Sequence, residues 1–221
     1  MRVSRVGVPP MRYCVLTIST FCQRCILGPA LCIALGLPLV SSPSVAEECP
    51  TAQSGRHGFV VERNERQKSE IFQGDQNTVR TVMRYDGTTL LETTQFEGLF
   101  LLDRLDRGRR TKYVPRTDLK ALFPMKPGRH IGAQFTTESD GEAGQLTVEI
   151  IVKAPEDMYI GPCKYSVVRI EHSESHGTGA AQFISTDFYS PELKLVLARQ
   201  YKNRNGRTEL IKYDRIYPIK D

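Results

Sequence analysis

Apolar and polar residues alternate along much of the chain from residue 56 onward. Leu146, Val148 and Ile150, for example, are separated by Thr147 and Glu149. A period of two predicts β-strands that place one face on a core, and it favours an antiparallel sheet. We count about 11 strands, with boundaries uncertain by 2–4 residues. The clearest runs are 79–85, 88–96, 99–105, 109–114, 146–151, 165–172, 183–189, 193–198 and 209–217.

Short polar pairs that contain glycine separate several of these runs. Turns are expected at Asp86-Gly87, Glu97-Gly98, Arg107-Gly108 and Asn205-Gly206. Asp-Gly and Asn-Gly are strong hairpin signals, because both turn residues must tolerate a positive φ.

One segment, Pro115–Pro127, breaks the strand pattern. Within it, Thr117–Phe123 predicts one or two helical turns, with Thr117 as the cap and Pro124 as the stop. We interpret the segment as a crossover or a lid inside one domain.

The predicted fold is therefore mainly β, with one short helix. About 11 strands with little helix must protect their edges by curling or stacking, so we expect a single curved antiparallel sheet, half-barrel or barrel-like. The concave side of such a sheet is filled by its own side chains, by the 117–123 turn, or by a ligand.

Residues 1–46 have the pattern of a secretory signal peptide. They contain no acidic residue, and an apolar run over 25–40 is followed by Ser44 and Ala46 at the small positions of a cleavage site. The run is shorter than the ~20 residues that span a bilayer as a helix, so we expect no retained transmembrane anchor. A retained anchor is the alternative, and Met11 is a second candidate start. The positive charges of the segment are Arg2, Arg5, Arg12 and Arg24.

Export gives a mature chain of residues 47–221, interpreted as a single antiparallel β domain in the periplasm. The signal holds 4 of the 30 Lys and Arg residues and none of the 25 Asp and Glu residues, so the formal charge falls from +5 to about +1. This balance gives no reason to expect nucleic acid as a partner.

Cysteine usage agrees with export. Four of the six cysteines lie in the signal, and Cys49 and Cys163 remain. Two cysteines in an exported chain favour one disulfide; two free thiols or an intermolecular bond are the alternatives.

Two motifs in the second half resemble a known family. Leu122–Gly128 (LFPMKPG) resembles the approach to a strand, and Asp187–Leu193 (DFYSPEL) resembles the "YSPEL" turn, of secreted Gram-negative envelope domains of unknown function. These domains are similar to the half-barrel of periplasmic lipoprotein-sorting chaperones. The resemblance covers about residues 120–217, implies a curved antiparallel sheet in the cell envelope, and carries over no catalytic residue.

His172, Glu174 and His176 form the most suggestive chemical pattern. Residues two apart in a strand share a face, so two imidazoles and a carboxylate could hold zinc. The spacing matches no established metal motif and runs into a polar turn at 176–179, so a solvated turn is favoured over a metal site. We find no G-x-S-x-G or phosphate-binding loop, and we predict no catalytic residue and no cofactor.

A basic hairpin is the candidate anion site. Guanidinium groups suit phosphate and carboxylate, which envelope lipids and glycans supply. A solvated hairpin that keeps the sheet soluble is the favoured alternative. The candidates are Arg104, Arg107, Arg109, Arg110 and Lys112.

The leading functional hypothesis is a non-catalytic periplasmic protein that binds an apolar or amphiphilic ligand in the concave face, or supports envelope integrity. It predicts a largely apolar pocket with few titratable groups. The alternative is a structural module that docks on an envelope protein or an anionic glycan through the basic hairpin. A metal-dependent hydrolase that uses His172 and His176 is the least favoured hypothesis.

Overall fold

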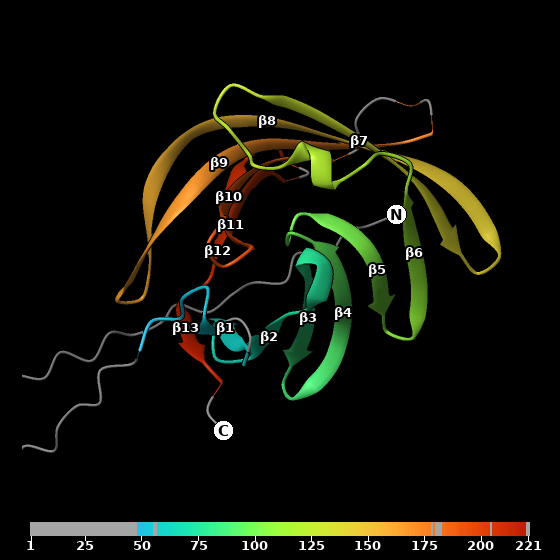
Figure 1. Cartoon of the computed structure of the whole chain (residues 1–221). Helices are drawn as coiled ribbons and strands as arrows, with labels where there is room; N and C mark the ends of the chain where they lie inside the picture. Colours follow the sequence, from blue (N-terminus) through green and yellow to red (C-terminus); the bar gives the residue numbers. More distant parts are fainter. Residues whose placement is uncertain (1–47, 55–56, 178, 180–182, 204, 220–221) are drawn as a thin grey trace, which may run out of the picture. The chain divides into compact units, whose positions relative to one another are not determined.

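A single curved antiparallel sheet dominates the computed structural model of the protein (Figure 1). The structure describes residues 48–54, 57–177, 179, 183–203 and 205–219, and these residues contain thirteen strands rather than the predicted eleven. The spatial order is β12-β11-β10-β9-β8-β7-β6-β5-β4-β3-β2-β1-β13. The strands are β1 (Phe59–Arg63), β2 (Gln67–Gln73), β3 (Thr78–Tyr85), β4 (Thr88–Phe96), β5 (Phe100–Asp106), β6 (Arg109–Pro115), β7 (His130–Ser139), β8 (Glu142–Ile160), β9 (Cys163–His176), β10 (Phe183–Ser190), β11 (Leu195–Lys202), β12 (Thr208–Lys212) and β13 (Arg215–Pro218).

Turns with two consecutive residues at positive φ connect several hairpins, as the sequence predicts. Asp86-Gly87, Glu97-Gly98 and Arg107-Gly108 all have both residues at positive φ, and Asp140-Gly141 adds a fourth turn of this kind. Such turns match the right-handed twist of the flanking strands, so they favour pairing of neighbours in the sequence. The prediction of turns at the first three pairs is confirmed.

The predicted strand over 209–217 is wrong in an informative way, because the structure divides it in two. Residues of β12 pair with β11, whereas β13 pairs with β1 at the opposite end of the ladder. The change of partner takes place over two residues: the Tyr213 amide donates to the Leu197 carbonyl (3.4 Å), and the Asp214 amide donates to the Glu62 carbonyl (2.8 Å). The last two strands of the chain, β12 and β13, are thus the two opposite edge strands of the sheet.

Two apolar clusters form the core, and β9 contributes to both. Val167 and Ile170 are each at most 1% exposed, although alternation places them on opposite faces. The buried face of β9 therefore changes along the strand. Its neighbour β8 has a bulge between Val152 and Pro155 in the same region, and this bulge also accommodates Pro155 inside a long strand. The first core cluster consists of Phe96, Leu99, Phe100, Leu119, Ile131, Ala133, Phe135, Leu146, Val148, Ile150, Val152, Ile170 and Tyr189. The second consists of Phe59, Val61, Ile71, Val79, Ile160, Cys163, Tyr165, Val167, Leu193, Leu195, Leu197 and Ile216.

The segment between β6 and β7 contains only a 3-10 turn, Lys120–Leu122, in place of the predicted α-helix. The Thr117 hydroxyl accepts the backbone N–H of Gln134 on β7 (3.0 Å) and so does not cap a helix. The interpretation of this segment as a lid agrees better with the structure, because the segment packs on the core of the sheet. Leu119 is 6% exposed in the first core cluster, and the ring of Phe123 packs edge-on against Phe96 and Phe100.

The "YSPEL" turn joins β10 to β11 and packs on the β4–β5 turn. The Ser190 hydroxyl accepts the Leu193 amide within the turn (3.3 Å), and both residues are fully buried. Gly98 of the other turn lies so close to the backbone of Lys194 that a Cβ there would collide with its carbonyl. The motif therefore has a structural role in joining distant parts of the sheet.

Cys49 and Cys163 form a disulfide, with sulfur atoms 2.02 Å and Cα atoms 5.5 Å apart. It links the start of the described chain to the first residue of β9. The predicted signal peptide, residues 1–46, lies outside the described residues. Among those that are described, no helix has the length and apolar character needed to cross a membrane.

Candidate functional site

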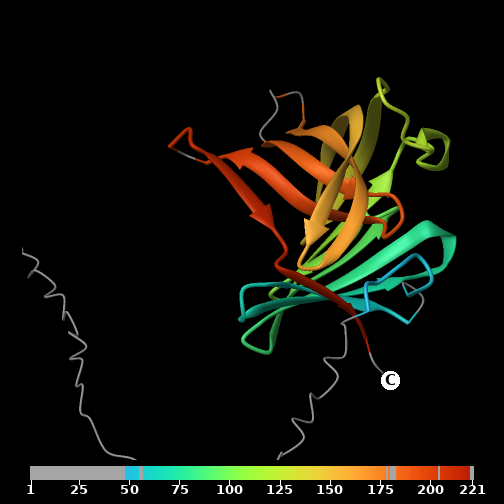
Figure 2. The same ribbon diagram turned by 90° about the vertical axis from the view of Figure 1, so that its left-hand side faces the viewer.

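A hollow of about 310 Å³ lies between strands that are distant in the sequence. One wall comes from β11 and β12, and the other from the ends of β1 and β2 with the middle of β3 and β4. Figure 2 shows these two groups of strands across the curve of the sheet from each other. Gly98, which contacts the "YSPEL" turn, also lines the hollow.

The lining combines an apolar wall with polar and basic groups. The partly exposed Leu91, Val196 and Ile211 supply the apolar surface, and the buried Leu195, Leu197 and Ala198 of the same strand region complete the lining. No Asp or Glu occurs among the described residues that line it. The polar and charged lining residues are Arg63, Gln67, Thr81, Thr93, Gln95, Arg199, Lys212 and Tyr213.

Arg199 is fixed in the wall by a buried carboxylate. Its Nε and Nη2 donate to the two carboxylate oxygens of Asp187, each at 2.7 Å, and the Asp187 side chain has no exposed surface. This two-point geometry is the strongest form of a guanidinium–carboxylate pair. Burial alone acts to raise the pKa of Asp187, but hydrogen bonds with His172 and Arg199 outweigh it and lower the pKa to about 2.

His172 extends the ion pair into a buried cluster. Its Nδ1 lies 3.2 Å from Asp187 Oδ2, and its Nε2 lies 3.2 Å from Glu174 Oε1. The Nε2 atom is buried without a well-oriented hydrogen bond, so its contact with Glu174 is ionic. Burial acts to lower the pKa of His172, but the two carboxylates outweigh it and raise the pKa.

The cluster carries balanced charge when His172 is protonated. Two cations, His172 and Arg199, then face two carboxylates, Asp187 and Glu174. The Ser185 hydroxyl adds a hydrogen bond to Asp187 Oδ1 at 2.8 Å. Because Arg199 lines the hollow and its guanidinium belongs to this cluster, the cluster holds one wall in place.

Sequence reasoning missed Asp187 and Arg199. A usable signal existed: Asp187 alternates with Ser185 and Tyr189 on the buried face of β10. A charged residue at a buried strand position needs a partner, and Arg199 lies opposite it on β11.

The predicted metal group is only partly brought together. His172 and Glu174 are in contact, but His176 is exposed at the end of β9. Both nitrogens of His172 already face carboxylates. Within the described part of the chain, no group of three or more His, Cys, Asp or Glu side chains is arranged to hold a metal ion.

The side chains of the basic hairpin lie on two faces of the sheet, and three of its cations, Arg104, Arg109 and Arg110, form ion pairs with carboxylates. Arg104 contacts Asp106 (2.6 Å), and Arg109 contacts Asp140 (2.7 Å). Arg110 and Lys112 lie on the other face by strand alternation, and Arg107 lies in the turn.

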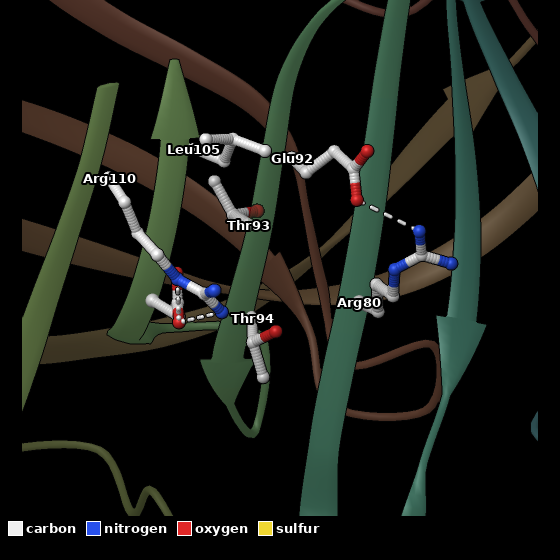
Figure 3. Close-up of a pocket in the computed structure, with 7 residues that line it drawn as sticks. Arg80, Glu92, Thr93, Thr94, Leu105 and Arg110 are labelled. Carbon is white, nitrogen blue, oxygen red and sulfur yellow. Dashed lines mark hydrogen bonds and ion pairs between the residues drawn. The ribbon is translucent and has the colours of Figure 1, made fainter. Parts of the chain in front are cut away.

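Arg110 lines a second, smaller hollow of about 230 Å³ at the surface of β3–β6 (Figure 3). Arg110 pairs there with Asp103 at 2.7 Å, and Arg80 pairs with Glu92 at 2.8 Å. Both guanidinium groups are therefore neutralised by carboxylates of the same site, which weakens the case for an anion here.

Comparison with known proteins adds little. No protein-family model and no curated protein matches the chain. Among solved structures, the hypothetical lipoprotein YmcC from Escherichia coli K12 is similar over 70% of this chain and 86% of its own, at 12% identity and a TM-score of 0.42.

Proposed function

We propose that the protein is an exported, non-catalytic binding protein that takes an apolar or amphiphilic ligand into the hollow between β11–β12 and β1–β4. The observation that carries the proposal is the apolar lining of a space of about 310 Å³, in which Leu91, Val196 and Ile211 are partly exposed. Small-molecule sites in proteins are concave, mostly apolar, and start near this volume.

The walls of the hollow are held in advance of any ligand. The Asp187–Arg199 pair supports the β10–β11 side, and the "YSPEL" turn packs against the β4–β5 turn. A preformed site loses less conformational entropy on binding than one that must be ordered, so this rigidity favours binding.

In this proposal the buried His172–Asp187 pair is structural and does not serve as a general base. A general base needs an imidazole nitrogen that can reach a substrate proton. In this cluster both nitrogens of His172 face carboxylates and the side chain is 6% exposed.

The disulfide supports the exported location, because such bonds persist in oxidising compartments. We place the protein in the periplasm on this ground and on the predicted signal peptide. Recovery of the protein from the periplasmic fraction, with an intact mass that corresponds to residues 47–221, is the expected result. A full-length protein in the cytosolic fraction would contradict it.

Neighbouring residues of β12 allow a matched test of binding. Ile211 lines the hollow, whereas Leu210 is 56% exposed. The neutral fluorophore N-phenyl-1-naphthylamine is expected to bind the wild-type protein with an increase in emission. Ile211→Glu should lower its affinity about tenfold or more, because it replaces partly buried apolar surface that a neutral probe contacts with a charged group. Leu210→Glu should leave the affinity unchanged. Equal affinities for the two variants would refute the site, and wild-type protein that fails to bind the probe or any co-purifying lipid would refute the function.

A further inference from the structure

The charged lining of the hollow is all of one sign. Arg63, Arg199 and Lys212 contribute cationic groups, and no carboxylate lines the space among the described residues. A ligand that enters this hollow therefore meets positive charge beside an apolar wall.

The three cations differ in how far they are already neutralised. Arg199 is held at two points by Asp187, so its charge is balanced within the protein. Lys212 makes one hydrogen bond, from Nζ to the backbone carbonyl of Tyr159 at 3.3 Å, which leaves its charge unbalanced. The described residues give the Arg63 side chain no hydrogen bond and no ion pair.

Arg63 and Lys212 come together where the chain passes from one end of the sheet to the other. Arg63 ends β1 and Lys212 ends β12. The Asp214 amide donates to the Glu62 carbonyl at 2.8 Å, so the residue before Arg63 is bonded to the residue two beyond Lys212. This backbone contact brings the two residues to one end of the hollow.

Two carboxylates lie near Arg63, and the structure shows how each is held. Asp214 Oδ2 accepts the backbone amide of Asn64, the residue after Arg63, at 2.7 Å, and Asp214 does not line the hollow. Glu209 is within electrostatic reach of Arg63. Its two oxygens accept hydrogen bonds from the Tyr201 hydroxyl (2.9 Å) and the Asn203 side-chain amide (2.6 Å), and it does not line the hollow. Glu209 therefore does not fill the position that a ligand would take.

We infer that the ligand carries a single anionic group, a carboxylate or a phosphate monoester, on an apolar chain, and that Arg63 and Lys212 bind this group while Leu91, Val196 and Ile211 cover the chain. The inference rests on the proposed function and specifies its ligand class. Guanidinium and ammonium groups are the usual partners of these anions, and charge-assisted hydrogen bonds in a partly dry site are about twice as strong as neutral ones.

Four probes, each with twelve carbons in the chain that bears the head group, test the inference on the protein recovered from its native fraction: dodecanoate, dodecyl phosphate, dodecanol and dodecyltrimethylammonium. At low salt, at least one of the anions should bind about tenfold or more tightly than dodecanol, and the cation should bind more weakly than dodecanol. The affinity of the anion should fall as salt is added, because the two cations are partly exposed to solvent. The ranking of dodecanoate against dodecyl phosphate identifies the preferred anion, and either ranking supports the inference.

Charge-removing variants assign the residues. Arg63→Gln and Lys212→Gln should each weaken binding of the anion about tenfold and leave dodecanol binding unchanged. Lys202→Gln removes an exposed charge from β11 outside the hollow and should change neither affinity. If dodecanol and both anions bind equally well and no variant separates them, the binding function stands and the anionic ligand is refuted. If none of the four probes binds, the proposed function falls and takes the inference with it.

Discussion

The hydroxyl of Tyr189 donates a hydrogen bond of 2.8 Å to the backbone carbonyl of Glu97, 92 positions earlier in the chain. Tyr189 is the first residue of the "YSPEL" motif, and Glu97 belongs to the β4–β5 turn. The bond therefore joins two parts of the sheet whose strands are not paired with each other. Tyr189 is 2% exposed in the first core cluster, and burial raises the pKa of its phenol well above the usual range. The hydroxyl therefore remains a donor throughout the pH range of folding experiments.

Tyr189→Phe should lower the free energy of unfolding by about 1 kcal/mol, because it removes the donor and leaves the Glu97 carbonyl without this partner. Urea unfolding measures the change as a shift in midpoint at constant slope. Tyr159→Phe is the matched control: its side chain is 56% exposed, and its loss of a hydroxyl should have an effect of less than about 0.5 kcal/mol. Equal effects of the two substitutions would contradict the role assigned to the bond.

Gly98→Ala should be among the most damaging small substitutions in the chain. Gly98 has a φ of 69°, and an added Cβ would meet the carbonyl of Lys194. Gly108 occupies the same turn position with a φ of 89°, but a Cβ added there would have no other atom within 4 Å. Gly108→Ala therefore reports backbone strain alone, about 1–2 kcal/mol. Gly98→Ala should cost about 2 kcal/mol or more beyond that, and thermal unfolding of both variants that gave the same midpoint would refute the close contact.

Local patterns were sufficient to predict most of the fold. The β-rich runs and the turns at Asp86-Gly87 and Glu97-Gly98 reflect short-range chemistry, because alternation and positive φ are properties of adjacent residues. The division of 209–217 into β12 and β13 depends on which edge each residue meets. That choice depends on contacts with β11 and β1, which are remote in the sequence, so alternation alone could not reveal it.

The candidate site was less predictable for the same reason. The pattern His172, Glu174 and His176 predicts a cluster within one strand. In the structure, His172 also contacts Asp187 on the next strand. The hollow is lined by residues as far apart as Arg63 and Tyr213. Only the curvature of the sheet brings them together, and curvature depends on bulges that no short motif predicts.

His172 should make stability depend on pH above neutrality. Burial acts to lower its pKa in the folded protein, but Asp187 and Glu174 outweigh burial and raise the pKa, compared with about 6.5 when unfolded. The corresponding stabilisation is fully present below about pH 6.5 and is lost as the pH rises through the higher folded value. The free energy of unfolding, measured between about pH 6 and 9, should therefore fall for wild type, and this fall should be smaller for His172→Gln.

His130 provides the control for this measurement, since it is exposed on β7. His130→Gln should retain the wild-type dependence on pH. If His172→Gln retains it as well, the buried imidazole is not the group responsible.

Asp187 should act in the opposite direction at acid pH. Its pKa is about 2 in the folded protein and about 3.9 when unfolded, so it contributes about 2–3 kcal/mol of stability that is present above about pH 4 and lost as the pH falls through about 2. Asp187→Asn should destabilise the protein by about 3–5 kcal/mol at about pH 7, because it leaves Arg199 and His172 without their carboxylate. It should also reduce the loss of stability between about pH 4 and 2. Urea midpoints at these pH values check both effects, and a variant as stable as wild type at neutral pH would show that the cluster does not support the wall.

The Cys49–Cys163 disulfide closes a loop of 114 positions, so reduction should strongly favour the unfolded state. A loop of this length corresponds to about 4–5 kcal/mol in the chain-entropy model, an upper value that measured bonds often fall below; we expect about 2–4 kcal/mol. The Cys49→Ala, Cys163→Ala double variant should match the reduced wild type in its urea midpoint and should not respond to added reductant. Because these are the only cysteines of residues 47–221, the processed wild-type protein should show no free thiol under denaturing conditions without reductant. Two reactive thiols in the protein taken from cells, or equal midpoints with and without reductant, would contradict a stabilising bond and would also remove one of the two reasons for placing the protein outside the cytosol.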